Sequence, residues 1–283
     1  RRGRIDFDRL DFMAAAILPD TKKAASDSYV TGRKNIIIEK LTELQFSLEV
    51  AGIVVGYDDS LDLDLELFLV QCSKSGCGIS RGIDSKTLKT KTRISFIRKD
   101  LKSLPTGIGV LKWLKALAVG ANDLKDLPEE LTLLSQLRRL DISNNNFESV
   151  PKVVETLANL EFLNVSCNKL KTLSPGLMQL RRLRELDASG NSIKSVHADV
   201  RNLTSLEVLD LSSNHLVSLP RQVKQLSRLT TLRLSSNPRL LSLPKELKTL
   251  NLKCLTVGPS LHDDPAATYL SNRNATFIKK EHY

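Results

Sequence analysis

The feature that most limits how this chain can fold is a set of asparagines that recur every 23 positions. They are Asn122, Asn145, Asn168, Asn191, Asn214 and Asn237. Aliphatic residues stand at fixed distances from each asparagine: eight, five and three positions before it, and in most units two and five positions after it. A repeat of this length predicts stacked units, because one unit is too small to bury its apolar side chains alone.

Each unit begins with period-two alternation and ends with aliphatics spaced three apart, such as Leu131, Leu134 and Leu137. This pattern predicts a short strand followed by a 3-10 or loose helical turn. We expect the asparagine to turn inward where the strand ends and to bond backbone groups of its own and the adjacent repeat. The pattern extends one unit each way, with Lys99 and Ser260 at the asparagine position, so about eight parallel strands are expected.

The segment LEVLDLSSNHLVSLP, residues 206–220, resembles the short leucine-rich repeats of the Ras-binding group, which includes Ras suppressor, Scribble, Erbin and the plant intracellular Ras-group proteins. The resemblance covers about residues 91–260. It implies an α/β repeat fold, a right-handed curved leucine-rich-repeat solenoid. It also implies a non-catalytic scaffold that binds proteins, often small GTPases or phosphatases, on the concave face. Two units depart from the pattern, since the proline is shifted at Pro175 and replaced by His197.

The flanking segments do not follow the repeat. We interpret residues 1–35 as an extended arm that orders on a partner. Residues 36–72 are predicted to form a β-hairpin cap, because Leu61 to Leu67 alternate with acidic residues. Residues 73–90 are predicted to be a linker, and residues 261–283 a C-terminal cap and tail.

The net charge of +10 is concentrated in the repeats, where residues 91–258 hold 26 of the 42 basic residues and 15 of the 32 acidic residues. A surface with this excess attracts acidic partners. The four cysteines are too few and too scattered for a disulfide framework, which favours an intracellular, reducing compartment, first the cytoplasm. An organelle, reached through a leader cleaved before Arg1, or the nucleus is the alternative. The longest apolar run, around residues 50–55, is too short to span a bilayer.

The sequence contains no motif that is typical of an enzyme. It lacks a phosphate-binding glycine loop, and its four histidines are isolated. Asp141, Asp187 and Asp210 share one predicted column, but an aspartate at this position is usual in this repeat class. We therefore predict no catalytic residue, metal, cofactor or small-molecule substrate.

The predicted binding surface is formed by the strand positions that alternate with buried ones. An aromatic residue beside an arginine is a plausible hot spot for protein binding. The candidate partner-binding residues on the concave face are Arg139, Phe162, Glu185, Asp187, Asp210 and Arg233.

Basic residues form a second candidate surface. One group lies three residues after the asparagine position and the other lies near the strand starts; together they are Lys102, Lys125, Lys171, Lys194, Arg138, Arg181, Arg182 and Arg184. This stripe supports an alternative function, a structural subunit of a large ribonucleoprotein or organellar assembly. Such a subunit would contact acidic protein or RNA phosphates, because aromatics are too sparse for base stacking.

Overall fold

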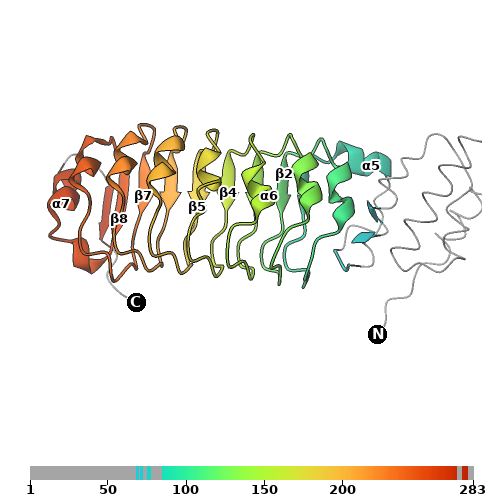
Figure 1. Cartoon of the computed structure of the whole chain (residues 1–283), viewed down its shortest axis with the longest axis horizontal. Helices are drawn as coiled ribbons and strands as arrows, with labels where there is room; N and C mark the ends of the chain where they lie inside the picture. Colours follow the sequence, from blue (N-terminus) through green and yellow to red (C-terminus); the bar gives the residue numbers. More distant parts are fainter. Residues whose placement is uncertain (1–67, 70, 73–74, 78–84, 273–275, 280–283) are drawn as a thin grey trace, which may run out of the picture. The chain divides into compact units, whose positions relative to one another are not determined.

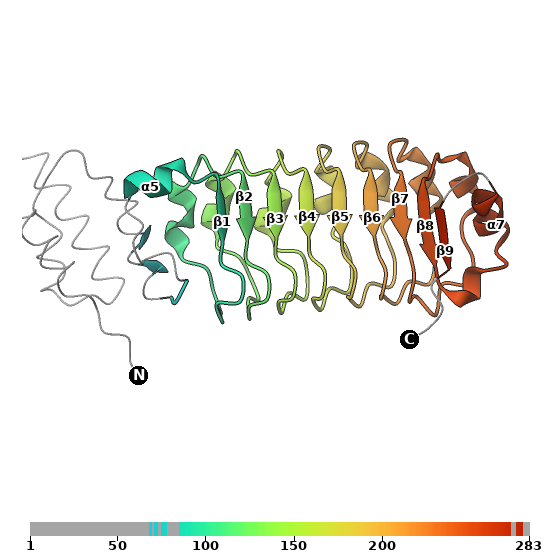
Figure 2. The same ribbon diagram turned by 180° about the vertical axis from the view of Figure 1, so that it is seen from behind.

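The repeats fold into a row of parallel strands. The computed structural model describes residues 68–69, 71–72, 75–77, 85–272 and 276–279, all of which belong to a compact unit spanning Asp64–Tyr283. In this unit nine strands lie side by side in one sheet, in the order in which they occur in the sequence (Figure 2). Seen from the opposite side, the short helices lie in front of this sheet (Figure 1).

The strands are short and keep a constant register. They are β1 (Arg93–Ser95), β2 (Ala116–Ala118), β3 (Arg139–Asp141), β4 (Phe162–Asn164), β5 (Glu185–Asp187), β6 (Val208–Asp210), β7 (Thr231–Arg233), β8 (Cys254–Val257) and β9 (Thr276–Lys279). From β1 to β8 every paired residue lies 23 positions after its partner. The predicted solenoid and its eight strands are confirmed, and β9 adds a ninth strand from the predicted C-terminal tail.

A short helix follows most of the strands. These helices are η1 (Thr106–Val110), η2 (Glu129–Leu133), α6 (Lys152–Glu155), η3 (Leu177–Gln179), η4 (Ala198–Asn202), η5 (Arg221–Gln225), η6 (Lys245–Thr249) and η7 (Pro259–Leu261). A proline with φ between −57° and −72° precedes five of them, which suits the fixed φ of its ring. His197 replaces the proline before η4, and its Nδ1 accepts a hydrogen bond from the Asp199 N–H at 3.2 Å.

The aliphatic positions of the repeat form one continuous core. Leu131, Leu134, Leu137 and Leu140 are each at most 2% exposed. The corresponding residues of the other repeats join the same cluster from Phe68 to Leu270. Burying one such side chain stabilises the fold by about 1.5–3 kcal/mol.

The six repeat asparagines connect neighbouring units through their amides. Asn168 Nδ2 donates to the carbonyls of Ile142, Val165 and Ser166 at 3.0–3.1 Å, and its Oδ1 accepts from the Phe147 N–H at 3.1 Å. Two of these four bonds reach the preceding repeat. The other five asparagines have equivalent partners. We call this set the asparagine ladder.

A left-handed backbone conformation recurs immediately before the ladder position. The residues with φ between 51° and 64° at this place are Arg98, Ala121, Asn144, Cys167, Gly190, Ser213 and Ser236. Six of these seven are not glycine, although a side chain at positive φ costs roughly 1–2 kcal/mol. The tight turn after each strand imposes this conformation, so the ladder and the core must offset the cost.

The N-terminal end departs from the sequence prediction. Phe68, Leu69, Gln71 and Cys72, at the end of the predicted hairpin, have helical backbone. Phe68, Leu69 and Cys72 are buried, and this spacing is that of one helical face. The strand prediction does not hold for these residues, because the alternation that suggested it stops at Leu67.

A second helix, α5 (Ser85–Thr90), lies inside the segment predicted as a linker. Its residue Leu88 is buried in the core of the solenoid, and so is Cys77, which precedes this helix in the sequence. Gln71 Oε1 accepts a hydrogen bond from the Gly107 N–H at 2.9 Å and so attaches the preceding segment to η1. The predicted arm over residues 1–35 and the hairpin up to residue 67 lie outside the described residues.

The C-terminal end is closed by α7 (Pro265–Ser271) and one buried carboxylate. Asp264 Oδ1 accepts from the N–H groups of Ala266 and Ala267, while its Oδ2 accepts from the Leu243 N–H at 3.0 Å. One side chain therefore caps α7 and attaches it to the last repeat. Ser260, at the asparagine position, donates its hydroxyl to the Leu240 carbonyl at 3.1 Å.

Candidate functional site

The exposed side of the sheet, which we call the strand face, presents two columns of side chains. The first column runs Arg93, Ala116, Arg139, Phe162, Glu185, Val208, Thr231, Cys254, and the second runs Ser95, Ala118, Asp141, Asn164, Asp187, Asp210, Arg233, Thr256. Each column follows the strand pairing, so neighbours within a column lie about 4.8 Å apart along the sheet. All six candidate partner-binding residues lie in these columns.

A groove of about 440 Å³ crosses the first five strands of this face. Its lining includes Ala116 and Ala118, whose small side chains hollow the face at β2. Arg93 borders the groove on one side of these alanines, and Arg139 borders it on the other side. Part of the groove therefore lies between two arginines, and the rest continues past Arg139 to Glu185 and Asp187 on β5.

Arg139 and Phe162 contact each other. The guanidinium carbon lies 3.5 Å from the centre of the Phe162 ring, a stacked cation–π contact. Among the described residues, none forms an ion pair or a side-chain hydrogen bond with Arg139 or with Arg93. The ring orients the Arg139 guanidinium and leaves its N–H donors available to a ligand.

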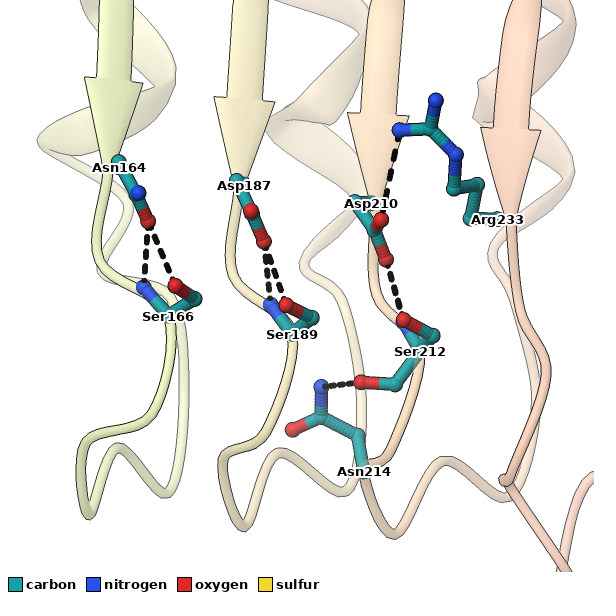
Figure 3. Close-up of polar contacts among 8 residues, drawn as sticks. All are labelled: Asn164, Ser166, Asp187, Ser189, Asp210, Ser212, Asn214 and Arg233. Atoms are coloured by element: carbon teal, nitrogen blue, oxygen red, sulfur yellow. Dashed lines mark hydrogen bonds and ion pairs between the residues drawn. The ribbon is translucent and has the colours of Figure 1, made fainter. Parts of the chain in front are cut away.

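The polar residues of the second column turn one oxygen back onto their own loops. Asp187 Oδ1 accepts from the backbone N–H of Ser189 at 3.0 Å and from its hydroxyl at 2.6 Å, and Figure 3 shows the same arrangement at β4 and β6. Asn164 makes these bonds with an amide oxygen, so the carboxylate charge is not needed for this structural role. The acidic residues are thus loop caps, and two of them, Asp141 and Asp187, also line the groove.

Arg233 differs from Arg139 in having a protein partner. Its Nη1 lies 3.4 Å from Asp210 Oδ2, a contact visible between β6 and β7 in Figure 3. Both members of this pair are therefore partly satisfied within the chain, and the C-terminal half of the strand face offers fewer free charges than the N-terminal half.

The predicted basic stripe is divided between two edges of the sheet. The lysines 102, 125, 171 and 194 come after the ends of the strands. Glu148 occupies the equivalent position in the repeat between Lys125 and Lys171, and its Oε2 lies 3.3 Å from Lys171 Nζ. Near the strand starts, Arg138 pairs with Glu161 at 2.9 Å, and Arg184 binds both carboxylate oxygens of Glu207.

The remaining two arginines of this edge are not paired with an acidic residue among the described residues. Arg182 donates to the side-chain oxygen of Asn159, and Arg181 is exposed. The stripe is thus less positive near the strand starts than its sequence suggests, because two of its arginines are neutralised by glutamates 23 positions later.

Sequence reasoning missed Arg93 and the two alanines of the groove. The signal for Arg93 was present, because the sequence predicts a repeat with Lys99 at the asparagine position, and the strand of that repeat adds one residue to each column. The repeat pattern does not reveal the groove, because its shape depends on the side chains of five adjacent strands.

Two family models match this region of the chain. A leucine-rich repeat region matches residues 76–198, and a leucine rich repeat matches residues 181–238. The chain is therefore a leucine-rich-repeat protein. Domains of this class are typically non-catalytic and typically bind proteins through extended surfaces.

Solved structures share the architecture. A leucine-rich-repeat protein of Leptospira interrogans is 26% identical, with a TM-score of 0.56 over 69% of this chain and 55% of that one. A functional domain of InlJ from Listeria monocytogenes, which includes a cysteine ladder, is 18% identical, with a TM-score of 0.52 over 70% of this chain and 41% of that one. The second likeness concerns the fold alone, and the chain spans about half the length of these structures.

No curated protein matches the sequence. In the part of the chain that the structure describes, no helix combines the length and the apolar character that a membrane crossing requires. Within the same residues, no group of three or more His, Cys, Asp or Glu side chains is arranged to hold a metal ion.

Proposed function

We propose that the protein is a non-catalytic scaffold that binds a protein partner on the strand face. The observation that carries this proposal is the Arg139–Phe162 contact at the border of the groove. An arginine that is already oriented by an aromatic ring loses little conformational entropy on binding, and arginine is enriched among binding hot spots. Glu185, Asp187, Asp210 and Arg233 belong to the same proposed surface.

The Ras-binding type of repeat is part of this proposal. The constant 23-residue register and the prolines before five of the short helices support it. A small GTPase or a phosphatase is accordingly the first class of partner to test.

An intracellular location is also part of the proposal. The four cysteines are free thiols, which suits a reducing compartment. The hydrogen bond with Cys77 and burial raise the pKa of the Cys72 thiol, which therefore stays protonated in the core.

A second candidate function is that of a structural subunit in a large assembly. The observation that favours it is the row of exposed lysines 102, 125 and 194, none of which is paired with a described residue. Acidic protein or RNA phosphates would be the ligands of this edge, which lies beyond the ends of the strands.

The test compares two variants of the full chain in affinity capture from cell extract after chemical cross-linking. Ala116→Glu fills the hollow and places a carboxylate between Arg93 and Arg139. The same column already holds Glu185, so the backbone accepts the substitution. Thr132→Glu, on the exposed side of η2, is the matched control.

A protein retained by the wild type and by Thr132→Glu, but lost from Ala116→Glu, supports binding on the strand face. Equal capture by all three rejects it. Loss only on replacing lysines 102, 125 and 194 by alanine supports the assembly subunit instead.

A further inference from the structure

The N-terminal corner of the strand face carries unpaired positive charge. Arg93, Lys115 and Arg139 lie at or next to the starts of β1, β2 and β3, and all three are exposed. Within the described ranges, no acidic side chain forms an ion pair with any of them. Arg138, next to them, differs because it is paired with Glu161. This corner therefore offers three unpaired cations to an anionic ligand.

The two arginines of the groove have a defined spacing. Arg93 and Arg139 occupy the same column two strands apart, which places their Cα atoms about 10 Å from each other. Between them, Ala116 leaves room for a ligand group to reach both. Guanidinium groups bind carboxylates through two parallel hydrogen bonds, and the stacked Arg139 presents its donors in one plane.

The opposite side of the groove is negative. Asp141 and Asp187 use one carboxylate oxygen for their own loops and leave the second oxygen without a protein partner among the described residues. Glu185, in the first column, is exposed. Asp141 lies on the same strand as Arg139, and Glu185 and Asp187 lie two strands further along. A nucleic acid backbone, which is negative along its whole length, would be repelled by these carboxylates. The groove therefore suits a ligand that carries both signs of charge.

We propose that the groove binds a segment of a protein partner through two carboxylates, one on Arg139 and one on Arg93, with a basic or amide group of the same segment on Asp141 or Asp187. This inference rests on the proposed function and specifies the chemistry of the partner. Lys115 adds to the attraction at the edge, and Phe162 contributes by positioning Arg139.

The experiment is a selection of random 12-residue peptides displayed on phage against the full chain. The expected peptides contain at least two acidic residues and one basic residue. Synthetic copies should lose about tenfold or more in affinity for Arg139→Ala and for Arg93→Ala, since each change removes a charge-assisted pair. Arg139→Lys should lose most of the same affinity, because lysine keeps the charge but not the paired donors. Lys224→Ala, which removes an exposed cation on η5 away from the groove, is the control and should bind normally.

Several outcomes would overturn the proposal. The first is that no peptide is selected, or that the selected peptides lack acidic residues. The second is that the peptides bind both arginine variants as tightly as the wild type. The third is that a 12-nucleotide uridine RNA binds more tightly than the peptides and depends on Arg93 and Arg139. Thermal unfolding of each variant shows whether a loss of affinity reflects a loss of fold.

The Ala116→Glu variant separates this proposal from the scaffold function. Peptides that lack acidic residues but are lost from Ala116→Glu would leave the strand face as the binding surface and reject the carboxylate chemistry. Peptides that bind Ala116→Glu as well as the wild type would reject both proposals.

Discussion

The two halves of the strand face share one backbone but differ in how their charges are paired. Over β1–β5, Arg139 stacks on a ring and has no acidic partner among the described residues, beside a groove of about 440 Å³. Over β6 and β7, Arg233 lies 3.4 Å from Asp210. Strand length and register are the same in both halves.

This difference shows how a repeat protein separates folding from recognition. The buried positions and the asparagine ladder are nearly constant along the chain, whereas the exposed columns vary. Because a change in a column does not alter the backbone, binding residues can collect in one half without loss of stability in the other.

The largest expected effect tests whether the two halves share one scaffold. Asn168→Ala, in the first half, and Asn214→Ala, in the second, each leave several buried backbone groups unpaired. We expect each to lower the free energy of unfolding by about 2–4 kcal/mol, measured by urea denaturation. The exposed Asn251→Ala is the control and should cost less than about 1 kcal/mol. A difference above about 2 kcal/mol between the two ladder variants would contradict the comparison.

The second prediction concerns the acidic column. Asp187→Ala removes the acceptor for two bonds from Ser189 and should cost about 1 kcal/mol. Asp187→Asn should cost less than about 0.5 kcal/mol, because Asn164 already performs this role with an amide. Thermal unfolding of the two variants measures the difference. Equal costs would show that the charge itself stabilises the loop.

The third prediction compares the two arginine contacts by double-mutant cycles. The Arg139–Phe162 coupling energy should be about 0.5–1 kcal/mol. It should change little when the salt concentration is raised about tenfold, to about 0.5 M, because the contact pairs a cation with a neutral ring. The Arg233–Asp210 coupling should be about 0.5 kcal/mol and decrease in salt, because the Arg233 side chain is 43% exposed. The same salt response in both cycles would remove this distinction between the halves.

The smallest effect concerns the left-handed residues before the ladder. Cys167→Gly and Ser213→Gly relieve the positive φ but add entropy to the unfolded chain, so we expect a gain of only about 0.5 kcal/mol for each. Gly190→Ala should destabilise, because its new Cβ would lie 3.0 Å from the Cys167 sulfur at φ +64°. Shifts in the midpoint of thermal unfolding measure all three effects. A lower midpoint for both Cys167→Gly and Ser213→Gly would show that the turn is not strained.

The fold of the repeats could be predicted from the sequence because periodicity records burial directly. Asn168 and its leucines recur at a fixed spacing, and the spacing determines which side chains share a face. The ends could not be predicted in this way. Phe68 and Leu69 are helical because they cover the first repeat, and this packing is not visible in a local pattern of alternating residues.

The sequence predicted which residues lie on the strand face, but it did not predict the contacts between their side chains. Column membership follows from the register, so Arg139 and Phe162 could be named as neighbours. Their stacking, and the pairing of Arg233 with Asp210, depend on side-chain rotamers that the sequence does not specify. Asp264 was not among the predicted residues, although it is buried and joins α7 to the last repeat.

The asparagine ladder also has a consequence for how the chain folds. Its bonds between repeats join residues 21 or 26 positions apart at every step from Asn122 to Asn237. No step requires the closure of a long loop, and each added repeat costs the same closure entropy as the one before it. Folding can therefore begin at any pair of central repeats and spread toward both ends, with the helical caps adding last.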